Sequence, residues 1–156
     1  MELSKQNKLP LLFDPIRREW VTKTPEECVR QALLQQMIHR LDYPAPLVAV
    51  EKELQHLPHL QLNAHLPKRR IDIVVFAKGI HPLHTLFPIL LLECKAVALT
   101  SAVTRQVVSY NAIVQAPFLT IANEKQILTG CYNREKGQFC FEVGLPSYTD
   151  LLRQLK

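Results

Sequence analysis

The chain has 156 residues, of which 47% are hydrophobic and 21% charged, a composition typical of one compact globular domain with a real core. Lysine and arginine exceed the acidic residues by 19 − 14 = +5, a moderate basic balance that is compatible with nucleic acid without requiring it. Residues 1–10 lack the apolar core of a secretory signal, and no apolar stretch is long enough to span a membrane. Four cysteines without zinc spacing favour free thiols in a reducing cytoplasm. We therefore expect a cytoplasmic protein with no membrane partner.

The first twenty residues are predicted to form an N-terminal arm, followed by one domain over residues 21–156. Residues 9–15 are extended and apolar, which predicts a segment lying across the domain or a partner. Residues 16–21 predict a short strand with Trp20 packed inward. The two arginines of this strand either touch phosphate or lie on a solvated edge.

A helix is predicted over residues 25–41. Thr24 can cap it, Pro25 suits the first helical position, and Glu27 completes a capping box. Apolar residues then recur at helical spacing. Glu27 and Gln31 can project toward a site, although the capping role already accounts for Glu27.

Two strands that carry single acids follow this helix. Residues 47–54 predict the first sheet strand, in which Glu51 is either an extra acid beside a metal or a plain exposed carboxylate. Residues 69–76 are rich in β-branched side chains and carry Asp72 near their start. The histidine pairs His56-x-x-His59 and His81-x-x-His84 give zinc as a minor alternative, because both lie in predicted loops without obvious further ligands.

The most informative stretch is the apolar run of residues 89–96, which Pro88 opens and which contains Glu93-Cys94-Lys95. Side chains alternate along a strand, so Glu93 and Lys95 share one face and Cys94 the other. A carboxylate and an ammonium at the end of a buried strand are costly unless they are paired, hydrated or bound to a metal. A structural ion pair is therefore one interpretation, and a metal-dependent site is the other.

The connection over residues 77–88 is longer than a tight hairpin loop and predicts an irregular excursion. If the strands on either side pair antiparallel, a suitable register brings Asp72 beside Glu93 and Lys95. Two carboxylates that hold Mg²⁺ and a lysine near the water or the phosphorane charge are what a metal-dependent phosphodiesterase needs.

The remainder of the chain predicts a helix from Thr100 or Ser101 to about Val114, in which Gln106 and Tyr110 stand one turn apart. These two side chains either reach toward the acidic strand or, for Tyr110, simply belong to the core. The segments expected next are a parallel strand reached by a helical crossover, a hairpin and a short C-terminal helix, at residues 118–122, 126–143 and 147–156.

This order of parts resembles the PD-(D/E)XK nuclease superfamily. More closely, it is similar to the N-terminal nuclease domain of type I restriction enzyme R subunits, in its small stand-alone form. The matching motifs are Phe13-Asp14-Pro15-Ile16-Arg17-Arg18-Glu19-Trp20, Thr24-Pro25-Glu26-Glu27-x-Val29-Arg30-Gln31, Val50-Glu51-Lys52, Arg70-Ile71-Asp72-Ile73-Val74, Leu92-Glu93-Cys94-Lys95-Ala96 and Gln106-x-x-x-Tyr110-Asn111. The resemblance implies an α/β fold with a restriction-endonuclease-like mixed β-sheet core flanked by helices.

The resemblance also implies the roles of the site residues. Asp72 and Glu93 would be the metal ligands and Lys95 the catalytic lysine. The further members would be the main-chain carbonyl of Cys94 as a third ligand, Gln106 and Tyr110 as the accessory motif, and Glu51 as an additional acid. The cofactor would be Mg²⁺ or Mn²⁺, and the absence of a P-loop pattern implies no ATP site in this chain.

The leading hypothesis is thus metal-dependent hydrolysis of DNA phosphodiester bonds by an endonuclease-like domain. The basic residues expected to contact the DNA backbone are Lys68, Arg69, Arg70 and Arg105. One alternative is a non-catalytic nucleic-acid-binding or assembly module that keeps the nuclease fold, and another is a protein that binds no nucleic acid. A homodimer, with its contact over residues 9–15, and a separate partner protein are further expectations.

Overall fold

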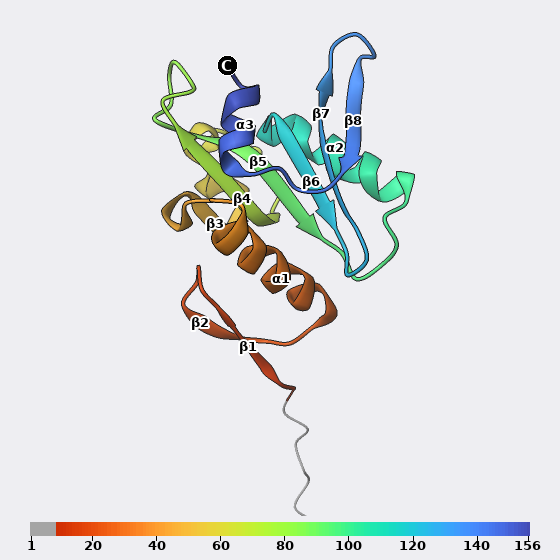
Figure 1. Cartoon of the computed structure of the whole chain (residues 1–156). Helices are drawn as coiled ribbons and strands as arrows, with labels where there is room; N and C mark the ends of the chain where they lie inside the picture. Colours follow the sequence, from red (N-terminus) through yellow and green to blue (C-terminus); the bar gives the residue numbers. More distant parts are fainter. Residues whose placement is uncertain (1–8) are drawn as a thin grey trace, which may run out of the picture.

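A six-stranded mixed sheet lies at the centre of the computed structural model, which describes residues 9–156 (Figure 1). The strands stand in the order β3-β4-β5-β6-β7-β8, and only β5 and β6 pair in parallel. Their bounds are β3 Val48–Glu53, β4 Arg70–Lys78, β5 Leu86–Cys94, β6 Phe118–Ala122, β7 Ile127–Asn133 and β8 Gln138–Val143. The parallel pair is joined by helix α2, Ser101–Val114, because parallel neighbours need a crossover. The expected restriction-endonuclease-like α/β fold is confirmed.

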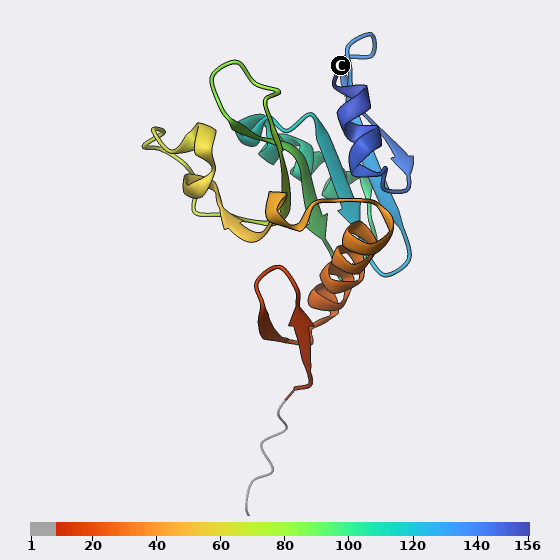
Figure 2. The same cartoon turned by 60° about the vertical axis from the view of Figure 1, so that its left-hand side comes forward.

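Helices cover both faces of this sheet. Helix α1 (Pro25–Arg40) and helix α3 (Tyr148–Gln154) pack on one face, and α2 packs on the other together with two short 3₁₀ turns, Leu54–His56 and Pro58–Leu60. The segment that holds these turns stands out from the sheet in Figure 2. None of the helices within residues 9–156 has the length and apolar character needed to cross a membrane.

Strands β4 and β5 are buried on both faces, which explains their continuous apolar runs. Successive side chains of β4 and β5, for example Val74, Val75, Leu91 and Leu92, are fully buried. Because successive side chains point to opposite faces, a strand covered by helices on both sides must be apolar throughout. The charged residues of these strands are therefore confined to the strand ends, and the candidate site lies at the end that carries Asp72 and Glu93.

Helix α1 begins and ends close to the predicted positions, but its capping differs. The Thr24 side chain accepts a hydrogen bond from the Glu27 N–H at 3.1 Å, as expected for an N-cap. The Thr24 N–H donates to the Thr22 carbonyl instead of the Glu27 carboxylate, so the reciprocal half of the capping box is not formed. The prediction that capping accounts for Glu27 was wrong, because arginines bind its carboxylate.

Residues 11–22 form a hairpin, in which residues 11–14 are extended as predicted and the later strand spans residues 19–22 in place of residues 16–21. Residues 1–8 of the predicted arm lie outside the described residues. Strand β1 (Leu11–Asp14) pairs antiparallel with β2 (Glu19–Thr22), and the hairpin lies beside α1 in both views (Figures 1 and 2). The prediction that Trp20 packs inward was also wrong, since this residue is 66% exposed and stacks edge-on against Phe13. A two-stranded hairpin has only one face to bury, and that face carries Asp14.

The predicted connection between the acidic strands is shorter than expected, because β4 and β5 extend to Lys78 and from Leu86. Pro88 does not open its strand but lies within it, opposite Phe76, where the register shifts between Val75 and Phe76. Proline cannot donate to the ladder and is tolerated where the pairing is irregular. The irregularity leaves the pairing toward the other end of the strands intact.

The C-terminal part follows the prediction closely. Strands β7 and β8 form an antiparallel hairpin, and α3 begins at Ser147, whose side chain accepts from the Asp150 N–H. One glycine is needed here: a Cβ added to buried Gly130 would lie 2.8 Å from the ring of Phe141 on the neighbouring strand.

We expect Gly130→Ala to destabilise the protein by about 1–3 kcal/mol, because the new methyl group forces the Phe141 ring out of its place. Phe141→Leu should relieve this contact, so the double variant should lose less stability than the sum of the two single variants. Urea unfolding of all three variants measures both effects. Simple additivity would contradict this explanation.

Candidate active site

Asp72 and Glu93 come together at one end of the central strand pair. The register pairs Ile73 with Leu92, so the next positions along the two antiparallel strands are Asp72 and Glu93. The Cys94 N–H donates to Asp72 Oδ2 at 2.7 Å, which fixes the Asp72 carboxylate against the end of β5. The two acids that the sequence predicted to meet are therefore neighbours.

Glu93 is a buried carboxyl group with an unused oxygen. Glu93 is only 5% exposed, and its Oε1 atom has no hydrogen-bond partner. Burial, followed by repulsion from Asp72, raises the pKa of Glu93 to about 8, although the positive charges of Lys95 and Arg69 act in the opposite direction. A buried oxygen without a partner is costly unless a proton or a cation neutralises the group.

Lys95 lies just beyond β5, where its N–H donates to the Ala122 carbonyl at 2.8 Å. Its charge is close enough to Glu93 to favour the ionised carboxylate. Within residues 9–156, however, no ion pair joins Lys95 to an acid, so the structural ion pair considered above is not formed. Lys95 also lines a cavity of about 710 Å³ between α1 and the β6–β7 turn. Lys95 is thus a half-buried residue at the edge of this cavity.

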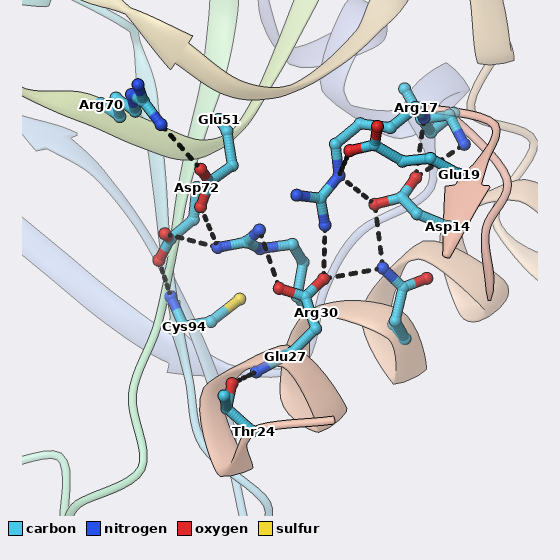
Figure 3. Close-up of polar contacts among 12 residues, drawn as sticks. Asp14, Arg17, Glu19, Thr24, Glu27, Arg30, Glu51, Arg70, Asp72 and Cys94 are labelled. Atoms are coloured by element: carbon cyan, nitrogen blue, oxygen red, sulfur yellow. Dashed lines mark hydrogen bonds and ion pairs between the residues drawn. The ribbon is translucent and has the colours of Figure 1, made fainter. Parts of the chain in front are cut away.

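Arg30 of α1 is the centre of an ion-pair network that reaches Asp72 (Figure 3). Its guanidinium lies 3.1 Å from Asp72 Oδ1, 2.9 Å from Glu51 Oε1 and, through Nη1, 3.1 Å from Glu27 Oε2. Burial alone would lower the pKa of Arg30, but the charges of Asp72, Glu27 and Glu51 outweigh it and raise the pKa. The guanidinium is therefore held charged among three acids.

Glu51 lies in β3 at the position opposite Asp72, between the register pairs Val50↔Ile73 and Lys52↔Ile71. Its second oxygen accepts from Arg70 Nη1 at 3.3 Å. Burial raises the pKa of Glu51, but its bonds to Arg30 and Arg70 prevail and lower it. The residue has φ +54°, a conformation rare for a side chain other than glycine, and such strain persists only where surrounding contacts fix it.

Helix α2 brings one of the two predicted accessory residues to the site. Tyr110 is 5% exposed, its hydroxyl has no hydrogen-bond partner, and the Arg69 guanidinium lies 4.0 Å from its ring centroid. Burial, and then the charge of Glu93, raises the pKa of Tyr110. Gln106, one turn earlier, is exposed on the same helix, as is Arg105. Tyr110 therefore belongs to both the core and the site.

The predicted phosphate-contacting residues form an exposed edge. Lys68 and Arg70 are exposed, and Arg69 is half-buried against Tyr110. These residues line a shallow hollow of about 450 Å³ beside the 3₁₀ turn that follows β3. The edge lies directly before Asp72 in the chain, whereas Arg105 is on α2.

The donors at Asp72 and Glu93 suit Mg²⁺ or Mn²⁺ in chemical type. Both are hard carboxylate oxygens, and the Glu93 Oε1 atom lacks a partner, while Mg²⁺ is commonly held by one or two carboxylates with water and phosphate oxygens completing its shell. Over residues 9–156, no group of three His, Cys, Asp or Glu side chains is arranged to hold a metal ion. A metal at this site would therefore depend on main-chain and water oxygens in addition to the two acids.

The histidines considered for zinc gather elsewhere, around Phe87. The ring centroids of His81 and His84 are 4.8 Å apart, and His59 lies 6.2 Å from His84. His81 stacks on Phe87 at 4.7 Å. In the described part of the chain these rings do not form a three-ligand metal group, and they pack as aromatic side chains.

The mixed sheet, its flanking helices and the paired acids at the strand ends define a restriction-endonuclease-like α/β protein. Residues 25–146 match the sequence model of the family described as Type I restriction enzyme R protein N terminus (HSDR_N). The chain belongs to this family, as the resemblance predicted. The matched region contains Arg30, Asp72, Glu93 and Lys95 but begins after the β1–β2 hairpin. No curated protein and no solved structure matches the chain.

Arg30 is not among the site residues predicted from the sequence, although the sequence carries a signal for it. Arg30 lies three, four and seven residues before Leu33, Leu34 and Met37, which are all buried, so it occupies the core-facing stripe of α1. An arginine in such a stripe requires a buried acid as its partner. The sequence does not say which acid, because the partners lie 21 and 42 residues away.

Proposed function

We propose that this protein is a metal-dependent nuclease that hydrolyses DNA phosphodiester bonds at Asp72, Glu93 and Lys95. The observation that carries the proposal is the buried Glu93 carboxyl, whose Oε1 atom has no partner, beside a second acid, Asp72. Lys95 lies close by and forms no ion pair with any residue of the described range, 9–156. The family supports a restriction-enzyme module of this kind. A buried carboxyl whose Oε1 atom has no partner supports a functional role, because a structural carboxylate such as that of Asp14 has its oxygens satisfied by hydrogen bonds.

Each residue has a role in this proposal. Asp72 and Glu93 would hold Mg²⁺ or Mn²⁺, with the main-chain carbonyl of Cys94 as a third ligand. Such an ion lowers the pKa of water and neutralises phosphate charge. Lys95 would orient the attacking water or stabilise the negative charge that develops on the phosphate. Tyr110, with Gln106 one turn away, would border the site from α2.

The basic edge supports DNA as the substrate. Lys68, Arg69 and Arg70 lead directly into the strand that carries Asp72, and Arg105 lies on the helix that carries Tyr110. Contacts from such residues to phosphate position a duplex without reading its sequence. Binding should accordingly weaken steeply with added salt.

We expect Lys95→Met to reduce the cleavage of supercoiled plasmid in Mg²⁺ or Mn²⁺ on the order of 100-fold or more, the loss typical when one group that stabilises developing charge is removed. Cleavage is measured by gel assay, and DNA binding by fluorescence anisotropy in the same buffer. Lys125→Met is the matched control, because Lys125 is exposed and lines the same cavity as Lys95. Equal cleavage by the wild type and both variants would refute the assigned centre.

One observation favours the alternative of a non-catalytic nucleic-acid-binding or assembly module. Both Asp72 oxygens already have partners, Arg30 and the Cys94 N–H, so the acid also contributes to structure. Salt-sensitive DNA binding without cleavage in either metal would support this alternative.

Contacts with other protein chains form a separate part of the proposal. The exposed face of the β1–β2 hairpin carries Leu11, Phe13 and Trp20, which are 55%, 47% and 66% exposed. Apolar side chains grouped in this way are typical of an interaction surface. A homodimer or a complex with a separate partner protein would cover them, and sedimentation analysis distinguishes the two.

A further inference from the structure

We infer that Arg30 is a positioning residue that takes the place of a second cation in the site and so restricts it to one metal ion. The inference rests on the proposed function for the first ion, at Asp72 and Glu93. It concerns the other side of Asp72, where Glu51 and Glu27 face the guanidinium. Nothing in the family relationship assigns a role to Arg30.

The contacts of Arg30 are those of a bound cation. Three carboxylates from three different elements, α1, β3 and β4, converge on one guanidinium at 2.9–3.1 Å. Arg30 itself is only 4% exposed, so water contributes little to its neutralisation. Without a positive charge at this point, Glu27, Glu51 and Asp72 would repel one another, and only Glu51, whose side chain is 34% exposed, would be well hydrated.

The same contacts divide the oxygens of Asp72 between two neighbours. Oδ1 faces Arg30, while Oδ2 accepts from the Cys94 N–H on the side of β5 and Glu93. Glu51 is occupied on both oxygens, by Arg30 and Arg70. A second divalent ion would need Glu51 and Oδ1 of Asp72, and Arg30 holds both.

The backbone at Glu51 is consistent with this arrangement. A left-handed residue within a strand is retained when its side chain is held from outside, and here two arginines hold it. Arg30 therefore fixes the position of Asp72 directly and that of Glu51 against it. If the guanidinium were removed, the Cys94 N–H would still hold Asp72 and Arg70 would still hold Glu51, so the two carboxylates would remain as a ligand pair.

The test is to count bound Mn²⁺ by electron paramagnetic resonance titration of the full chain. We expect one ion per chain for the wild type and one additional ion for Arg30→Met, which keeps the length but not the charge. Arg30→Lys restores a cation and should return to the wild-type count. Arg17→Met is the matched control, because Arg17 also pairs with Glu27 and with buried Asp14 but makes no contact with Asp72. It should leave the count unchanged.

The outcomes separate this inference from the proposed function. An unchanged Mn²⁺ count in folded Arg30→Met overturns the inference and leaves the Asp72–Glu93 centre intact. No Mn²⁺ on the wild type but one ion on Arg30→Met supports the role of Arg30 while refuting the metal centre of the proposed function. If Arg30→Met unfolds, the inference requires Mn²⁺ or Ca²⁺ to restore its melting transition, and failure of both ions to do so also overturns it.

A second Arg30 variant tests the position of the additional ion. Adding Glu51→Gln to Arg30→Met removes a ligand from the pair, so the additional Mn²⁺ should be lost while the first is kept. Retention of both ions in this double variant would place the extra ion elsewhere and overturn the inference.

Discussion

Glu93→Gln should stabilise the metal-free protein at pH 9 and at the same time abolish its Mg²⁺-dependent cleavage of DNA. Both effects arise from the buried carboxyl group, whose pKa is raised to about 8, first by burial and then by Asp72. Glutamine keeps the shape of the side chain but carries no charge to bury. It also cannot replace a carboxylate as a metal ligand.

The sign of the pH dependence follows from the two pKa values. In the unfolded chain Glu93 titrates near its ordinary pKa of 4.5, whereas in the folded protein it holds its proton up to about pH 8. The folded state therefore binds more protons between these values, and the free energy of unfolding falls as pH rises through that window. At pH 9 the charged carboxylate lowers the free energy of unfolding by an amount on the order of 5 kcal/mol, because the two pKa values differ by about 3.5 units.

The measurement is urea unfolding of both proteins in a chelator between pH 5 and pH 9. The wild type should lose stability relative to Glu93→Gln across this range, and the two curves should converge toward the acidic end. Glu124→Gln, at an exposed acid of the β6–β7 turn, should follow the wild type. Parallel curves for the wild type and Glu93→Gln would show that Glu93 ionises without cost.

Asp14→Ala is expected to lower the free energy of unfolding by about 3–5 kcal/mol, the range typical for breaking a buried charge pair. The Asp14 carboxylate is fully buried and accepts hydrogen bonds from the Ile16 and Arg17 N–H groups, the Arg17 guanidinium and the Gln31 amide, all within 2.9 Å. Its loss removes the acceptor of the Ile16 and Arg17 N–H groups, and leaves Glu27 as the remaining acceptor for the Arg17 and Gln31 side chains. The hairpin is then held less firmly against α1. Hydrogen exchange over residues 11–22 should rise together with the loss of stability.

Glu19→Ala is the matched control for Asp14→Ala. Glu19 lies opposite Asp14 in the hairpin, but its side chain is 60% exposed and its carboxylate is as far as 4.0 Å from the Arg17 guanidinium. Glu19 should therefore contribute no more than about 1 kcal/mol to the free energy of unfolding. An equal loss in both variants would mean that burial of the Asp14 carboxylate is not what attaches the hairpin.

The sequence by itself determined the elements of the central sheet and the presence of one acid near the end of each of two neighbouring strands. Apolar runs in β4 and β5 predict buried strands because every side chain along them must avoid water, and their charges can lie only at the ends. Antiparallel pairing of consecutive strands allows Asp72 and Glu93 to meet, and the observed register, which pairs Ile73 with Leu92, brings them together. The helix caps at Thr24 and Ser147 are equally local, since each depends on bonds within three residues.

Only the tertiary structure decided how the acids are neutralised and which side chains are exposed. Trp20 lies outside because its hairpin has one buried face, and that face is fixed by Asp14. Pro88 lies inside a strand because the register shifts opposite it. Arg30 finds Glu51 and Asp72 across 21 and 42 residues, and no local pattern specifies such partners. Charges in a core interact through space, so their pairing is set by the packing of α1 on the sheet and not by spacing along the chain.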